Sequence, residues 1–151
     1  MERKLKIAFI VPDNRDEFRR YEDPAPYFGT APTALLDGFT RLADECEIHV
    51  VNCVQRPLST PEKIARNIFY HTAVVPKWGW LRGGYLGCIR AVRRMLKKIQ
   101  PDIVHGQGTE RYCALSAVFS GFPNAVTIHG NMRAMAKFFH ARPGSFHWLT
   151  A

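Results

Sequence analysis

Pro101-Asp102-Ile103-Val104-His105-Gly106 has the apolar character of a buried strand, and Ala125-Val126-Thr127-Ile128-His129-Gly130 repeats that pattern further along the chain. Between them, residues 111–120 have helical character. A strand, a crossover helix and a second strand form a parallel unit, which is nearly always right-handed. Both strands would then bring their histidine to the same edge of the sheet, where ligands of open parallel sheets bind.

Strand and helix patterns also alternate along the rest of the chain. Apolar or β-branched strands are expected at 6–11, 47–54 and 67–75, and helices at 31–44 and 82–99. Thr30 would cap the first of these helices, and Pro101 would end the second. The alternation predicts an α/β fold: a Rossmann-like, doubly wound parallel sheet in three layers (α/β/α), with strand order 3-2-1-4-5.

Composition limits the class of protein. The chain has 151 residues, 46% hydrophobic and 23% charged, which is typical of one globular domain. No apolar run approaches the roughly 20 residues of a membrane-spanning helix, and the start lacks the pattern of a secretory signal, so we expect a cytoplasmic protein. A net charge of +8 suggests an anionic partner: a nucleotide, a phospholipid surface or nucleic acid.

The cysteines and histidines do not indicate a metal centre. Cys46, Cys53, Cys88 and Cys113 include no Cys-x-x-Cys pair, and buried thiols are expected. The six histidines lack spacings such as His-x-x-x-His. We therefore expect no metal ion and no resident cofactor.

Two loops could carry chemistry. The segment 12–30 is long for a connection from strand to helix, and Gly29 at its end would let a backbone come close to a ligand. The free N–H groups of the next helix would face an anion there. The segment 106–111 has two of the three glycines of a dinucleotide-binding motif, with Arg111 in place of the third. A tight turn into a helix capped by Thr109 is therefore favoured over dinucleotide binding.

Polar groups beside these loops are candidate ligands of a substrate. Glu110 and Arg111 would line the crevice or form a local ion pair. His105 and His129 could bind a hydroxyl group, accept its proton or stabilise a phosphate, since imidazole titrates near neutral pH. A structural role, with each ring bonded to a nearby backbone group, is the alternative for both histidines.

The region Trp78–Lys98 combines tryptophans, an apolar stripe and a basic face. Such a pattern fits a helix at a membrane interface, and it also fits an outer helix of the sheet whose charged face is solvated, which we favour. Nucleic acid is not expected as a partner, because no known binding module is present.

Four segments together resemble the N-terminal domain of a family 4 glycosyltransferase with the GT-B fold. They are the opening strand 6–11, the glycine loop Phe28-Gly29-Thr30, and the two strand segments 100–106 and 122–130. The similarity extends over nearly all of the chain.

The resemblance implies a function. Members of this family move a sugar from a nucleotide sugar to an acceptor hydroxyl, usually with retention and without a metal. By this similarity, His129 would be catalytic, Gly29 and Thr30 would contact the donor diphosphate, and His105, Glu110 and Arg111 would bind the acceptor, a sugar or glycolipid.

The resemblance also implies a division of labour between two domains. Residues 1–151 would form the acceptor-side domain of a longer protein, while a C-terminal domain outside this sequence would hold most of the nucleotide sugar. The chain alone would then be inactive. The alternative is a non-catalytic Rossmann-like domain that binds a nucleotide or a protein partner. A peripheral contact with the inner membrane face through Trp78–Lys98 also stays open.

Overall fold

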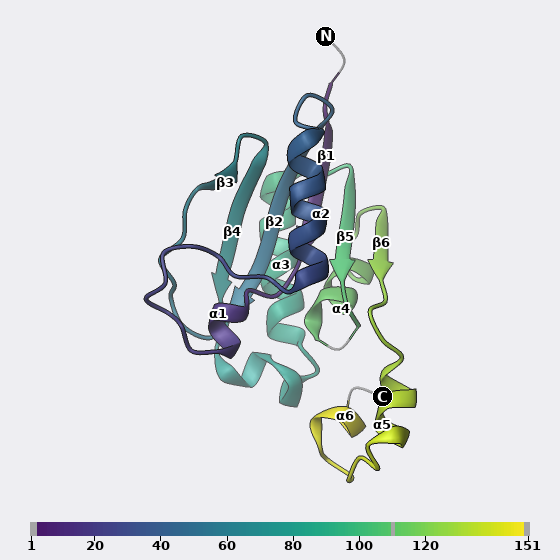
Figure 1. Cartoon of the computed structure of the whole chain (residues 1–151). Coiled ribbons are helices and arrows are strands. Elements are labelled where there is room, and N and C mark those ends of the chain that lie inside the picture. Colours follow the sequence, from purple (N-terminus) through teal and green to yellow (C-terminus); the bar gives the residue numbers. More distant parts are fainter. Residues whose placement is uncertain (1–2, 110, 150–151) are drawn as a thin grey trace.

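A computed structural model describes residues 3–109 and 111–149, and within these ranges six strands form one sheet (Figure 1). In sheet order they are β3 (Lys63–Ala65), β4 (Ile68–Val74), β2 (Cys46–Val54), β1 (Leu5–Ile10), β5 (Ile103–Gln107) and β6 (Asn124–Thr127). All neighbours pair in parallel except β3, which pairs with β4 in antiparallel fashion. Without β3, the order is the predicted 3-2-1-4-5.

Helices cover both faces of the sheet, which gives the predicted three-layer, Rossmann-like α/β/α fold. Helix α2 (Thr30–Arg41) lies on one face, and α3 (Leu86–Ile99) and α4 (Tyr112–Val118) lie on the other (Figure 1). Side chains of a strand alternate between faces. In β1, Phe9 therefore joins the core cluster beneath α2, and Ile10 joins the cluster beneath α3 and α4.

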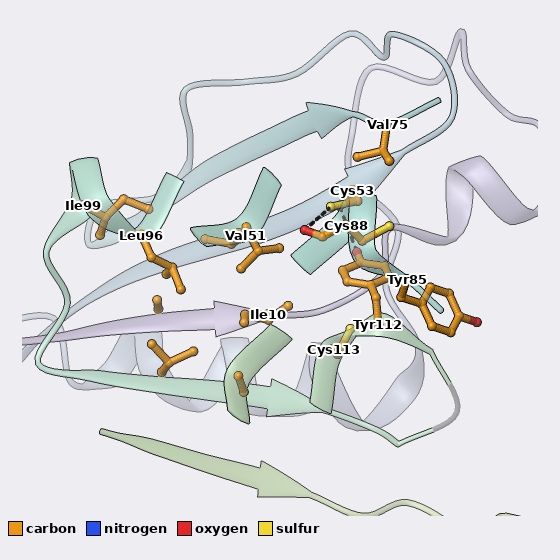
Figure 2. Packing of buried hydrophobic residues seen from close by; sticks show 14 residues of the cluster. Ile10, Val51, Cys53, Val75, Tyr85, Cys88, Leu96, Ile99, Tyr112 and Cys113 are labelled. Atoms are coloured by element: carbon orange, nitrogen blue, oxygen red, sulfur yellow. Dashed lines mark hydrogen bonds between the residues drawn. The ribbon is translucent and has the colours of Figure 1, made fainter. Parts of the chain in front are cut away.

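The core beneath α3 and α4 combines aliphatic side chains with two tyrosines and thiols (Figure 2). Tyr112 is fully buried there, and its hydroxyl oxygen accepts the backbone N–H of Cys53 at 2.9 Å. All four cysteines are buried, as the sequence predicted. Burial holds the pKa of the Tyr112 hydroxyl well above its usual value, so this group stays protonated and neutral in the core.

The longest helix is shorter than predicted. It begins at Leu86 and not at residue 82, because Gly84 and Tyr85 both have positive φ, of 58° and 59°, which an α-helix does not allow. Two single turns of 3-10 helix, Lys77–Gly79 and Leu81–Gly83, occupy the approach. Its end at Ile99 agrees with the prediction, since Gln100 adopts the left-handed conformation and Pro101 follows.

The apolar stripe of the Trp78–Lys98 region lies on the face of α3 that packs against the sheet. Cys88, Ile89, Val92, Leu96 and Ile99 pack into the core, and the basic side chains of α3 are exposed. This is the outer-helix arrangement that we favoured. No helix within the described ranges has both the length and the apolar content needed to cross a bilayer.

Two predicted helix caps were wrong. Gly29 is the N-cap of α2, so Thr30 is its first helical residue and caps nothing. Arg111 is the N-cap position of α4, and no side chain caps that helix, so Thr109 does not do so either. Gly108, with φ of 81°, does form the expected tight turn after β5.

The long segment after β1 is folded around a buried ion pair. It contains a short helix, α1 (Asn14–Glu17), in which Arg15 is fully buried beside Asp13, with Nη2 and Oδ2 2.9 Å apart. The Arg15 guanidinium also donates to the carbonyl oxygens of Asp23 and Ser59, at 2.6 and 2.9 Å. The segment is thereby fixed to the rest of the domain.

The last part of the chain lies beyond the carboxyl edge of the sheet (Figure 1). The final strand, β6, ends at Thr127, two residues before His129, where the sequence predicted that it would end. Two short helices follow, α5 (Met132–Phe138) and α6 (Phe146–Leu149). The side chain of Asn131 caps α5 by accepting the N–H of Ala134 at 3.0 Å.

Candidate functional site

A cavity of about 500 Å³ opens at the carboxyl edge of the sheet, where the strands point in Figure 1. It brings together four of the six residues proposed from the sequence: Gly29, Thr30, Arg111 and His129. They come from the start of α2, the start of α4 and the segment after β6. We call this cavity the edge cavity.

His129 contributes an exposed imidazole whose position is set by one contact. Its Nε2 lies 3.0 Å from Oε1 of Gln107, which also lines the edge cavity. An amide oxygen only accepts hydrogen bonds, so Nε2 of His129 carries the hydrogen. In the neutral ring, Nδ1 is then the basic nitrogen.

His105 lies behind this pair and not in the edge cavity. It occupies the middle of β5, half-buried, with its ring edge-on to Phe9. Its Nε2 lies 2.9 Å from the Gln107 amide nitrogen and 2.7 Å from the Thr127 hydroxyl. Burial, and to a lesser extent His129, lowers the pKa of His105 below 6.5. The structure thus makes His105 a neutral support for Gln107 and His129.

Arg111 faces the edge cavity as half of an ion pair. Its Nη2 lies 2.8 Å from Oε2 of Glu17 in α1, and both side chains are partly exposed. Arg111 thus has the crevice position that was predicted for it, and its ion-pair partner is Glu17, which is distant in sequence. Glu110, the acidic residue proposed from the sequence, lies outside the described residues.

The start of α2 presents backbone donors to the same cavity. The N–H groups of Thr30 and Ala31 belong to the first turn of a 12-residue helix, which has no preceding helical carbonyl to accept them. The helix macrodipole adds partial positive charge at this end. The helix terminus makes this wall of the cavity suited to an anion.

Three polar lining residues, Gln107, Asn14 and Glu17, were not predicted from the sequence. Gln107 could have been found, since it stands two residues after His105 and therefore on the same face of the strand. Asn14 and Glu17 belong to the charged segment after the first strand, which contains no recognised motif. Across the described ranges, no three His, Cys, Asp or Glu side chains are placed to hold a metal ion.

Comparison with solved structures shows the fold in other proteins. A Listeria monocytogenes protein assigned as a UDP-N-acetylglucosamine 2-epimerase aligns with a TM-score of 0.57 at 15% identity, covering 99% of this chain and 37% of that one. A second structure of a UDP-N-acetylglucosamine 2-epimerase aligns with a TM-score of 0.52 at 15% identity, covering 98% and 39%. The chain thus spans well under half the length of these structures.

Comparison by sequence gives the family. No curated protein matches the chain significantly. The family model described as Glycosyltransferase Family 4 matches residues 33–151, a segment that begins just after Gly29 and Thr30 and includes Arg111 and His129. The match extends over well more than half of the chain, and the chain therefore belongs to glycosyltransferase family 4.

Proposed function

We propose that this chain is the acceptor-binding half of a retaining glycosyltransferase, which moves a sugar from a nucleotide sugar to an acceptor hydroxyl in the cytoplasm. Family membership supports the reaction class. The observation that carries the proposal is the edge cavity, where Gly29, Thr30, Arg111 and His129 share one space.

Each wall of the edge cavity suits one part of such a reaction. The N–H groups of Thr30 and Ala31 would donate to the diphosphate of the donor, and Gly29 leaves room for that approach. Arg111 would exchange its partner Glu17 for the leaving diphosphate and so offset the negative charge that develops there, so that a metal ion is not required for this purpose. Nδ1 of His129 would accept a hydrogen bond from a sugar or acceptor hydroxyl.

The donor would be shared between two parts of a longer protein. Relative to the aligned structures, the chain has the length of about two-fifths of a complete protein. In this proposal the other part holds the nucleotide, and this chain supplies the acceptor surface and the diphosphate contact. A titration of the 151-residue chain with UDP-glucose is therefore expected to show only weak binding, and a micromolar dissociation constant would assign the donor to this half.

The decisive experiment uses the polypeptide that the whole reading frame encodes. It is incubated with nucleotide sugars labelled in the sugar and a panel of sugar and glycolipid acceptors. We expect label to move to an acceptor, and we expect His129→Ala to lower kcat by about 100-fold or more, within the usual contribution of a group that exchanges protons with substrate. Because the side chain of His129 is exposed, the melting temperature of the His129→Ala protein should equal that of the unmodified protein.

His140→Ala is the matched control, since His140 is also exposed but lies in the tail after α5. It should leave kcat unchanged.

A second candidate activity comes from the aligned structures, which are named as nucleotide-sugar epimerases. If the labelled sugar stays attached to UDP but is inverted at one carbon, the activity is epimerisation and not transfer. If kcat is unchanged in His129→Ala, His129 takes no part in the reaction.

A further inference from the structure

A second cavity, of about 530 Å³, lies beyond the carboxyl ends of β2 and β4. Five residues line it, and three of them are cationic: Arg19, Tyr21, Gln55, Arg56 and Lys77. We call it the cationic pocket. The proposed function above assigns it no role.

The three cations of the cationic pocket are not neutralised by the protein. Within the described ranges, no carboxylate lies within salt-bridge distance of Arg19, Arg56 or Lys77. The nearby carboxylate of Asp16 accepts the backbone N–H of Gln55 at 2.9 Å. The guanidinium of Arg56 rests 5.6 Å from the ring centre of Tyr21, a cation–π contact that leaves its N–H groups free to donate. Three like charges around one cavity attract an anion.

Arg19 occupies a backbone position that disfavours a side chain. It follows the end of α1, where the N–H of Arg20 donates to the carbonyl of Arg15 at 2.8 Å, and its φ is 56°. Helices usually end with glycine at this position, because the left-handed conformation crowds any other residue. An arginine here costs the fold stability and gains it nothing in the way of ion pairs. Such strain is commonly retained where a residue has a function.

A chain of shared lining residues connects the cationic pocket with the edge cavity. A third cavity, of about 360 Å³, is lined by Arg19, Tyr21 and Gln55 of the pocket and also by Glu17 and Arg111 of the edge cavity. One ligand could therefore extend from the groups around His129 to the three cations.

We infer that the cationic pocket binds a phosphoryl group carried by the acceptor. The acceptor is then a phosphorylated sugar or a lipid with a phosphate headgroup, with its reactive hydroxyl in the edge cavity. Guanidinium groups bind phosphate oxygens through paired, charge-assisted hydrogen bonds, which suits Arg19 and Arg56. The assignment to the acceptor rests on the proposed function, whereas phosphate binding by the pocket does not.

The test titrates the 151-residue chain with inorganic phosphate at constant ionic strength and follows backbone amides by NMR. We expect the largest shifts at Gln55 and Arg56. Arg19→Gly and Arg56→Gln should each weaken phosphate binding by about tenfold, the value of one charge-assisted contact. Arg19→Gly should keep or raise the melting temperature, since glycine relieves the strained backbone, so its loss of binding cannot come from unfolding.

The matched control is Arg93→Gln, which removes one positive charge from the outer face of α3. It should change phosphate affinity by less than about twofold. If all three variants lose phosphate affinity equally, the loss follows from the lower net charge of the protein, and the inference is overturned. Shifts centred on Thr30 and Ala31, with Gln55 and Arg56 unmoved, would also overturn it, because phosphate would then bind at the start of α2.

Vesicles identify the source of the phosphoryl group. Lys77 is followed by Trp78, whose side chain is 70% exposed and could contact lipid. If the acceptor is a lipid, the chain should sediment with phosphatidylcholine vesicles containing phosphatidic acid, and Arg19→Gly should abolish this. If it is a soluble phosphosugar, phosphate binds but the vesicles do not retain the chain. If phosphate binds but the whole protein transfers no sugar, the cationic pocket is supported and the proposed function is overturned. If sugar is transferred but phosphate does not bind, the proposed function is supported and the cationic pocket is overturned.

Discussion

The side-chain oxygen of Gln107 accepts the Nε2 hydrogen of His129, across the gap between β5 and the segment after β6. This contact joins the exposed imidazole to a buried amide, which is held in turn by His105. The orientation of the ring that faces the edge cavity is therefore fixed from inside the sheet. The proposed reaction depends on it, because it leaves Nδ1 of His129 as the basic nitrogen.

Replacing Gln107 by leucine should remove the preference of the neutral His129 ring for carrying its hydrogen on Nε2. Loss of a hydrogen bond worth about 1 kcal/mol shifts the ratio of the two neutral forms of His129 by about fivefold. Nitrogen chemical shifts of the His129 ring at pH 8 measure the ratio directly. A ratio that does not move in Gln107→Leu would mean that solvent, and not Gln107, decides which nitrogen carries the hydrogen.

Gly29, in the edge cavity, and Gly106, in β5, should respond differently to alanine. A Cβ at Gly29 would meet nothing closer than the Pro32 Cδ at 3.8 Å, so Gly29→Ala should cost less than about 1 kcal/mol of unfolding free energy. A Cβ at Gly106 would lie 2.7 Å from the backbone oxygen of Cys113, so Gly106→Ala must push α4 away from β5 and should cost about 1–3 kcal/mol.

Urea unfolding of the two variants measures this difference, and binding adds a second readout. Gly29→Ala should weaken the binding of any anion that approaches the N–H groups of Thr30 and Ala31, although the fold tolerates it. Equal stability of the two variants would contradict the packing described here for Gly106.

Arg15 should be among the most sensitive positions of the chain. In Arg15→Met, the carboxylate of Asp13 stays buried without its partner, and breaking such a pair costs about 3–5 kcal/mol. Urea unfolding measures the loss. The double variant Asp13→Asn with Arg15→Met removes both charges and should recover part of it.

Arg66→Met is the matched control for this prediction. Arg66 pairs with Asp44 at the same kind of distance, 2.8 Å, but both side chains are largely exposed to solvent. Its loss should leave the unfolding midpoint nearly unchanged. If both arginine variants unfold at the same urea concentration, burial does not strengthen the Arg15 pair.

Stability should fall as the pH drops below about 6.5. Burial lowers the pKa of both His71 and His105 in the folded chain from 6.5, so the unfolded chain binds more protons in this range. By linkage, the free energy of unfolding then decreases with decreasing pH, from the unfolded pKa down through the folded one. Thermal unfolding at pH 7.5 and 5.5 measures it, and His71→Gln with His105→Gln should flatten the dependence.

Sequence patterns predicted the parallel strands because each is an apolar or β-branched run, and helices separate β1 from β2, β4 from β5 and β5 from β6. The edge strand β3 was missed, since its three residues, Lys63–Ala65, have no periodicity to detect. The helix start was misplaced because Tyr85 has an apolar ring at a helical spacing but a left-handed backbone. Local patterns record burial, and they do not record a backbone conformation imposed by packing.

For the candidate site, the sequence pointed to Gly29, Thr30, Arg111 and His129, which share the edge cavity, because each stands next to the carboxyl end of a strand or the start of a helix. His105 was misplaced, since the strand continues for two residues beyond it. Glu17 and the cationic pocket came only from the structure. They depend on how the segment after β1 folds back, which is set by contacts with residues distant in sequence, such as Ser59.

Loops as long as that segment include lids that close over an active site as well as binding loops and linkers. Here Arg15 ties it to Asp23 and Ser59, and the N–H of Asn14 donates to the carbonyl of Tyr27 at 2.7 Å. These contacts anchor the segment to the body of the domain, so it forms a fixed wall of the site. Under the proposed function, a substrate would meet this side of the site already shaped, and a second domain approaching the open edge of the sheet would shield the reaction from water.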